Sequence, residues 1–157
     1  MIESKGYQRG EKMPIVEGRY EAKISTTFGS VEEAIDEIKN KIRRSRKIRI
    51  SNIPMELLEE LKPELQNKDA SIVLPLNEKP TPEIRKLGRI ATTKARIYKE
   101  YKGTEANSGS INFADRIFNI VWVDEKILEI DTMDYGRCVK CLNKTFETGW
   151  RYSEKYK

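Results

Sequence analysis

Histidine is absent from this chain of 157 residues. Its absence removes imidazole, which most often serves enzymes as a general base, a nucleophile or a metal ligand. Cysteine is scarce, with two residues three positions apart, which favours a reducing cytoplasm over a secreted disulfide scaffold. No apolar run is long enough to cross a bilayer and no signal-peptide pattern opens the sequence, so we expect a cytoplasmic protein with no membrane partner.

The composition and length of the chain predict one folded domain. Hydrophobic residues make up 38% and charged residues 35% of the chain, and the length suits a single domain. Residues 1–18 mix glycine, proline and charge without a period, so we expect a flexible N-terminal arm followed by one α/β domain at 19–157. The formal net charge of +5 permits a polyanionic partner without requiring one. Abundant lysine, glutamate and isoleucine would suit a thermophilic archaeon.

Strand and helix patterns alternate after this arm. Ser30 and Glu33 form a capping box, and the apolar residues that follow, up to Ile42, recur on one helical face. Pro54 fits the first turn of a second helix, whose end Pro63 should kink or shorten. The elements predicted in this half are a strand at 20–25, a helix at 30–42, a strand at 47–53, a helix from 54 to about 65 and a buried parallel strand at 70–76.

The second half reads as strands followed by a last helix. Thr81 and Pro82 open a short helix that Gly88 is placed to end. The further predicted elements are a strand at 94–101, a mobile Gly/Ser loop at 102–110, long strands at 111–124 and 127–132 joined by a turn at 124–126, and an amphipathic helix at 138–150. This order predicts an α/β fold in which a mixed sheet carries helices on both faces.

The order of elements resembles one repeat of the phospholipase D-like fold. It is similar in particular to the non-catalytic effector domain that follows the winged helix in the TrmB family of archaeal regulators. The strings that carry the resemblance are SVEEAIDEIKNKIRRSRKIRISNIP, LLEELKPEL, SIVLPL, FNIVWVDEKILEID and the aromatic end KTFETGW. The resemblance covers roughly residues 20 to 155 and implies a homodimer of single repeats. It also implies a regulatory domain without a winged helix of its own.

Catalytic members of this fold carry the motif H-x-K-x4-D, in which the histidine attacks phosphorus. If Asp124 is aligned with the aspartate, Asn119 replaces the lysine and Ile117 replaces the histidine. A phosphohistidine route needs the imidazole itself, which no other residue here supplies. The resemblance therefore implies a non-catalytic domain that senses a small molecule or binds a protein, with no cofactor.

Five side chains are the first choices for contacting such a ligand. Guanidinium groups bind carboxylate or phosphate with two parallel hydrogen bonds, and the ends of strands border the clefts of α/β sheets. The predicted ligand-binding residues are Arg96, Tyr98, Arg116, Asn119 and Asp124.

One basic segment supports an alternative function, that of a nucleic-acid-associated accessory protein. Its seven cations are Lys39, Lys41, Arg43, Arg44, Arg46, Lys47 and Arg49, with no acid among them. Cations at the C-terminal end of a helix are common because they oppose the negative pole of the helix dipole. No aromatic residue is interleaved for base stacking, so the sequence favours a solvated helix end over a nucleic-acid surface.

Cys138 and Cys141 form a C-x-x-C pair, which raises a redox or zinc-dependent enzyme as a further alternative. Zinc needs four ligands, and this chain offers no second cysteine pair and no histidine, so a closed site would require two subunits. The simpler interpretation places two small buried residues on the core face of the last helix. We therefore expect no metal.

Overall fold

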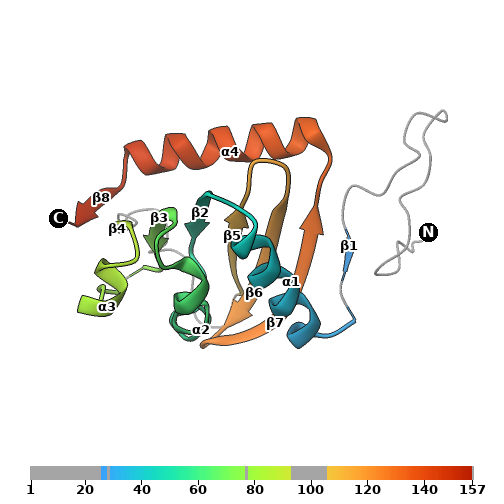
Figure 1. Ribbon diagram of the computed structural model, residues 1–157, viewed down its shortest axis with the longest axis horizontal. Coiled ribbons are helices and arrows are strands. Elements are labelled where there is room, and N and C mark those ends of the chain that lie inside the picture. The colour runs from blue at the N-terminus through green and yellow to red at the C-terminus, as the bar shows by residue number, and fades with distance from the viewer. Residues whose placement is uncertain (1–25, 28, 77, 93–105, 157) are drawn as a thin grey trace.

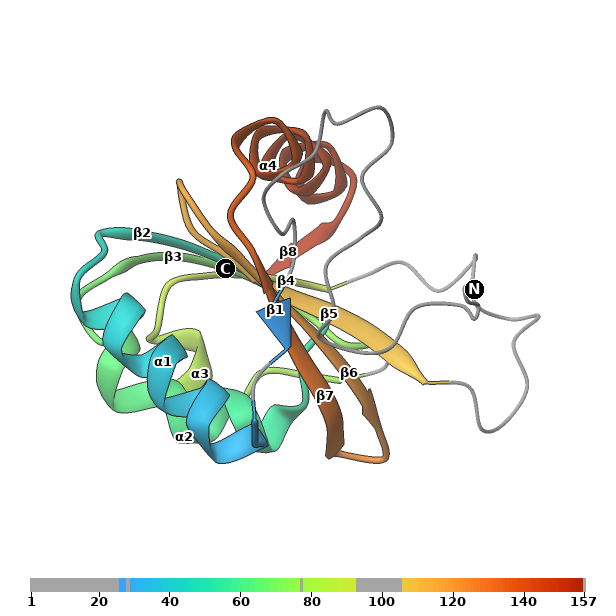
Figure 2. The same ribbon diagram turned by 90° about the vertical axis from the view of Figure 1, so that its right-hand side faces the viewer.

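The computed structural model describes residues 26–27, 29–76, 78–92 and 106–156. In these residues one eight-stranded mixed sheet has the order β1-β7-β6-β5-β2-β3-β4-β8. The helices α1, α2 and α3 lie on one face and α4 crosses the other (Figures 1 and 2). The predicted α/β fold with helices on both faces is confirmed. The predicted N-terminal arm at 1–18 and the strands predicted at 20–25 and 94–101 lie outside the described residues.

The strands are β1 (Thr26–Thr27), β2 (Lys47–Ser51), β3 (Asp69–Leu74), β4 (Arg89–Thr92), β5 (Asn107–Asn112), β6 (Ile117–Val123), β7 (Lys126–Met133) and β8 (Glu154–Tyr156). The helices are α1 (Val31–Arg43), α2 (Met55–Leu65), α3 (Pro82–Arg85) and α4 (Gly136–Arg151). β2, β3 and β4 run parallel, whereas β2 pairs with β5 in the antiparallel sense. The β2–β5 ladder therefore joins the parallel half of the sheet to the β5-β6-β7 meander.

The predicted starts of α1 and α3 are confirmed, whereas α2 begins at Met55 with Pro54 as its N-cap and α4 begins at Gly136, two residues before its predicted start. The Ser30 hydroxyl accepts a hydrogen bond of 3.1 Å from the Glu33 backbone N–H at the start of α1. The Thr81 hydroxyl accepts one of 3.2 Å from the Ile84 N–H at the start of α3. Each bond satisfies a donor that has no partner within the helix. Pro63 lies in the last turn of α2, which ends at Leu65, so its missing N–H removes a helical bond only near the end of the helix.

The main core lies between the sheet and the α1–α2 pair. Alternate residues of each strand point to this face, as β-strand geometry requires. The largest fully buried side chains include Ile38, Ile42, Ile48, Ile50, Leu58, Leu61, Ile72 and Phe118. No helix among the described residues is long and apolar enough to span a bilayer.

The strand predicted at 111–124 is wrong in its extent. The Phe113 N–H donates to the Arg116 carbonyl at 2.7 Å, so a tight turn separates β5 from β6. Phe113 is buried beside Phe118, so the apolar alternation continues through the turn and conceals it in the sequence. The loop predicted at 102–110 is also wrong at its end, because β5 begins at Asn107 and pairs with both β6 and β2.

Candidate ligand-binding site

A pocket of about 370 Å³ lies between α4 and the sheet, on the face opposite the main core. Its apolar side is formed by residues that include Ile117, Phe146 and Trp150. Its polar lining residues are Ser51, Ser110, Asn112, Asn119, Thr145 and Ser153. No charged side chain belongs to this lining in the described part of the chain, so the pocket offers neutral hydrogen-bonding groups.

Strand alternation places three of the polar residues in one row. On β6, Phe118 and Ile120 point into the main core, so Asn119 between them points toward α4. Asn119 pairs in register with Ser110 of β5, and Ser110 pairs with Ser51 of β2. The row therefore crosses three neighbouring strands on the floor of the pocket.

Asn112 is the most unusual residue of the lining. Its side chain is buried, with 3% of the residue exposed, and its Oδ1 has no hydrogen-bond partner among the described residues. A buried acceptor left unpaired costs roughly 1–3 kcal/mol. The oxygen is thus a buried acceptor, on a residue of the pocket lining, that the described residues leave unpaired.

The end of the pocket near β8 is aromatic. The rings of Phe146 and Trp150 stack with centroids 6.1 Å apart, and Phe146 packs on Val73 and Ala91. The Arg89 guanidinium carbon lies 5.9 Å from the centroid of the Trp150 ring, and the Lys155 ammonium lies 5.0 Å from it. Both cations are close enough to interact with the aromatic ring, and Arg89 also forms an ion pair of 3.2 Å with Asp69.

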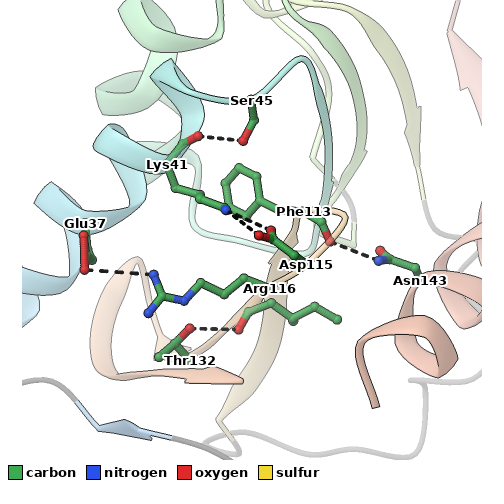
Figure 3. Close-up of polar contacts among 9 residues, drawn as sticks. Glu37, Lys41, Ser45, Phe113, Asp115, Arg116, Thr132 and Asn143 are labelled. Atoms are coloured by element: carbon green, nitrogen blue, oxygen red, sulfur yellow. Dashed lines mark hydrogen bonds and ion pairs between the residues drawn. The ribbon is translucent and has the colours of Figure 1, made fainter. Parts of the chain in front are cut away.

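The structure does not bring the predicted ligand-binding residues together. Asn119 lines the pocket, whereas Arg116 lies in the turn before β6, where Figure 3 shows it directed toward Glu37 of α1, 4.0 Å away. Asp124 lies in the turn after β6, at the opposite end of that strand. Arg96 and Tyr98 lie outside the described residues.

The turn that contains Arg116 is fixed from both sides of the sheet (Figure 3). The Lys41 ammonium of α1 forms an ion pair of 2.8 Å with Asp115, and the Asn143 side chain of α4 donates to the Phe113 carbonyl at 3.0 Å. The hydrogen bond from Lys41 holds the pKa of Asp115 below its usual value. The pocket is therefore bordered by a turn that contacts both helical layers.

Most of the predicted basic segment is neutralised by acids that are distant in sequence. The ion pairs are Lys39–Glu60 at 3.1 Å, Lys41–Asp115 at 2.8 Å, Arg43–Glu64 at 2.9 Å and Arg49–Glu147 at 2.6 Å. The segment's other cations, Arg44, Arg46 and Lys47, are exposed and make no ion pair within the described ranges. Three of the seven positions thus remain open to an external anion.

The predicted burial of the two cysteines is wrong. Cys138 is half-buried and Cys141 is exposed, and neither forms a disulfide. Val139 and Phe146 are the buried residues of α4, so the helix faces the sheet with a different set of positions. Within the described residues, no group of three or more His, Cys, Asp or Glu side chains is arranged to hold a metal ion.

No family model matches this sequence, and neither does any curated protein. Solved structures that share its fold include two phospholipase D-like proteins. NucT from Helicobacter pylori has a TM-score of 0.61 at 9% identity, over 84% of this chain and 98% of its own. Nuc from Salmonella typhimurium, a phospholipase D family member, has a TM-score of 0.57 at 9% identity, over 85% and 99%. This chain has a phospholipase D-like fold.

A third solved structure, TrmBL2, is described as an archaeal chromatin protein with a novel mode of DNA binding. It has a TM-score of 0.58 at 10% identity, over 87% of this chain, and this chain spans 55% of the TrmBL2 chain. The resemblance to phospholipase D-like and TrmB-type proteins expected from the sequence is confirmed at the level of the fold. In this phospholipase D-like fold, Ile117 and Asn119 share the strand β6 and line the pocket.

Proposed function

We propose that this chain is a non-catalytic phospholipase D-like domain that binds a small neutral ligand in the pocket between α4 and the sheet. The observation that carries the proposal is the buried Oδ1 of Asn112, which has no partner in the described part of the chain and belongs to the pocket lining. A ligand that donates a hydrogen bond to this oxygen would satisfy an acceptor that the described residues leave unpaired.

The side chains at the motif positions argue against the phosphohistidine chemistry of catalytic members of the fold. With Asp124 aligned to the motif aspartate, Ile117 and Asn119 stand at the histidine and lysine positions. Isoleucine cannot attack phosphorus, and asparagine carries no charge to hold the phosphate oxygens. The whole chain contains no histidine that could replace the missing nucleophile. The scaffold can keep its pocket without this chemistry, because function resides in the site and not in the fold.

The lining also limits the ligand. Hydroxyl and amide groups of residues such as Ser51, Ser110 and Asn119 both donate and accept hydrogen bonds, so they suit a ligand with several polar but uncharged groups. An anion would be desolvated without an opposing charge on the pocket floor, which is unfavourable. Phe146 and Trp150 would contact an apolar or ring-shaped part of the ligand.

A thermal-shift screen tests the proposal. The probes are neutral polyhydroxylated compounds, nucleosides and amides, with inorganic phosphate as the anionic probe. A neutral probe present at 100 times its Kd would stabilise the native state by about 2.7 kcal/mol. At roughly 2–4 °C per kcal/mol, the melting temperature would rise by about 5–11 °C. Phosphate should give a smaller shift than the best neutral probe.

Two variants provide the controls. Asn112→Ala removes the unpaired acceptor and should abolish most of the shift. Asn107→Ala, on the same strand but exposed and outside the pocket lining, should retain it. The proposal fails if no neutral probe stabilises the protein, if Asn112→Ala keeps the full shift, or if the pure protein hydrolyses a phosphodiester such as bis(p-nitrophenyl) phosphate.

The homodimer expected from the sequence remains a prediction. Light scattering coupled to size-exclusion chromatography should give a mass close to twice the 18.3 kDa of one chain. A mass of one chain at micromolar concentration would contradict it.

A further inference from the structure

The outer face of α4 carries a stripe of positive charge that the sequence analysis did not single out. Arg137, Lys140, Lys144 and Arg151 are spaced by three, four and seven residues, which places them along one side of the helix. All four are exposed, and none forms an ion pair among the described residues. We call these four residues the α4 stripe.

The acids around the stripe do not neutralise it. Glu147 is the sole acid of α4, and its carboxylate binds Arg49 of β2 at 2.6 Å. The cations of the basic segment at 39–49 differ in this respect. Acids of α2, α4 and the 113–116 turn bind four of those seven cations. Folding therefore neutralises most of the cluster that is dense in the sequence and leaves the dispersed cations of α4 unpaired.

The dimensions of the stripe suit a linear polyanion. From Arg137 to Arg151 the helix rises about 21 Å, at about 1.5 Å per residue. One strand of duplex DNA presents a phosphate about every 3.4 Å along the helix axis, so a stripe of this length faces about six phosphates. Four unpaired cations in a line are a suitable match for that row of charges.

The buried face of α4 helps to decide which class of anionic partner the α4 stripe suits. A helix that lies on a lipid surface must insert its apolar face into the headgroup region. Here that face is occupied, because Val139 and Phe146 are buried against the sheet. A protein interface would need apolar or aromatic anchors at its centre, and the stripe contains none.

We propose that the α4 stripe binds the phosphate backbone of duplex DNA without reading its sequence. Contacts to phosphate position a protein on the duplex but do not distinguish bases, and the stripe has only groups of this kind. This inference goes beyond the proposed ligand-binding function, since it rests on the opposite face of α4 and none of its residues lines the pocket.

A salt titration of DNA binding gives the first test. With four phosphate contacts, log K should fall with log salt concentration with a slope of about −3.6, so affinity drops about 150-fold between 50 and 200 mM salt. The measurement is fluorescence anisotropy with a labelled 20-base-pair duplex of mixed sequence. Two duplexes of different sequence should bind with the same affinity. No binding at 50 mM salt, or a large preference for one sequence, would overturn the proposal.

Two triple variants distinguish binding through the α4 stripe from attraction by the net charge of the protein. Lys140→Ala with Lys144→Ala and Arg151→Ala should bring the slope to about −0.9, since one contact remains. The matched control changes Arg44, Arg46 and Lys47 to alanine, which removes the same charge from the basic segment at 39–49. The control should keep the full slope. Equal losses in the two variants would show that net charge alone attracts DNA, and this would refute the assignment.

The lipid and protein alternatives are outcomes of the same assay. Vesicles containing phosphatidylserine and the acidic polymer polyglutamate are added as competitors at matched charge concentration. The proposal expects unlabelled duplex to displace the labelled duplex at a lower concentration than either competitor. Stronger displacement by vesicles or by polyglutamate would assign the stripe to a different partner. The Asn112→Ala variant should bind DNA like the unaltered protein. The DNA-binding proposal can therefore be tested whether or not the pocket binds a ligand.

Discussion

Replacing Gly109 by alanine should disrupt the junction between the two halves of the sheet. Gly109 lies on β5, and a Cβ atom built there would fall 2.6 Å from the carbonyl carbon of Asn52 and 2.7 Å from the carbonyl oxygen of Ser51. It would come closer still to the Asn52 carbonyl oxygen. Ordinary van der Waals contact begins near 3.4 Å and the obstructing atoms are backbone, so the strands must separate by more than about 1 Å. This shift strains the ladder between β5 and β2.

The expected loss of stability has two parts. Overpacking of a buried site typically costs about 1–3 kcal/mol. The Asn52 carbonyl also accepts a hydrogen bond of 2.9 Å from the indole N–H of Trp122, which is buried, and losing that partner costs roughly 1–3 kcal/mol more. We therefore expect a decrease of about 4 kcal/mol in the free energy of unfolding. At roughly 2–4 °C per kcal/mol, the melting temperature would fall by about 8–16 °C.

Urea denaturation followed by circular dichroism measures this change. Gly149→Ala is the matched control, because the same added methyl group meets no atom within 4 Å on α4. Alanine is favoured over glycine inside helices by about 0.8–1 kcal/mol, so the control should gain stability and move in the opposite direction. If Gly109→Ala unfolds within about 0.5 kcal/mol of the unaltered protein, the close approach of these strands is not as described.

Two further substitutions test local contacts. Ser30→Ala removes the N-cap of α1 and should lower the free energy of unfolding by about 1 kcal/mol, whereas Ser30→Asp should restore most of it, because aspartate is also a good N-cap. Asp115→Asn removes the Lys41 ion pair, whose carboxylate is 73% exposed, so the loss at pH 7 should be only about 0.2–1 kcal/mol. Because folding lowers the pKa of Asp115, the pair stabilises the fold above about pH 4, and this contribution is lost as the pH falls through the lowered pKa. The difference in stability between the two proteins should therefore shrink as the pH falls below about 4, and a difference that grows in acid would refute this account.

The strongest elements of the fold could be predicted from local sequence. The Ser30 cap and the 3.6-residue period fix α1, and Pro82 after Thr81 fixes the start of α3. The turn between β5 and β6 could not be found, because Phe113 keeps the apolar alternation while its N–H turns back to the Arg116 carbonyl. The small polar residues at 107–110 resemble a loop in sequence but pair on both sides in the sheet.

The site was predicted less completely than the fold. Asn119 could be identified through the motif position, but Ser51 and Asn112 were missed. Ser51 ends a strand in which Ile48 and Ile50 alternate with polar residues, a period-two signal present in the sequence, whereas Asn112 ends a strand of mostly small polar residues that carries no such signal. Arg116 and Asp124 are near each other in the chain, yet an intervening strand with a rise of about 3.3 Å per residue places them roughly 26 Å apart.

The charge pattern shows a further limit of local sequence. Glu60 and Glu64 of α2 bind Lys39 and Arg43 of α1, although 21 residues separate the members of each pair. The packing of two helices creates these ion pairs, and no window of adjacent residues contains them. A basic segment in a sequence therefore overstates the charge that the folded surface presents.

The two ends of α4 are attached to the sheet with unequal strength. Its first residues follow β7, an eight-residue strand that pairs with both β6 and β1. Its last residues lead into β8, three exposed residues whose one partner among the described strands is β4. Local opening begins where the fewest bonds and the least burial hold a segment. The C-terminal end of α4 should therefore separate from the sheet first. A ligand would then enter and leave the pocket at its aromatic side, beside Trp150.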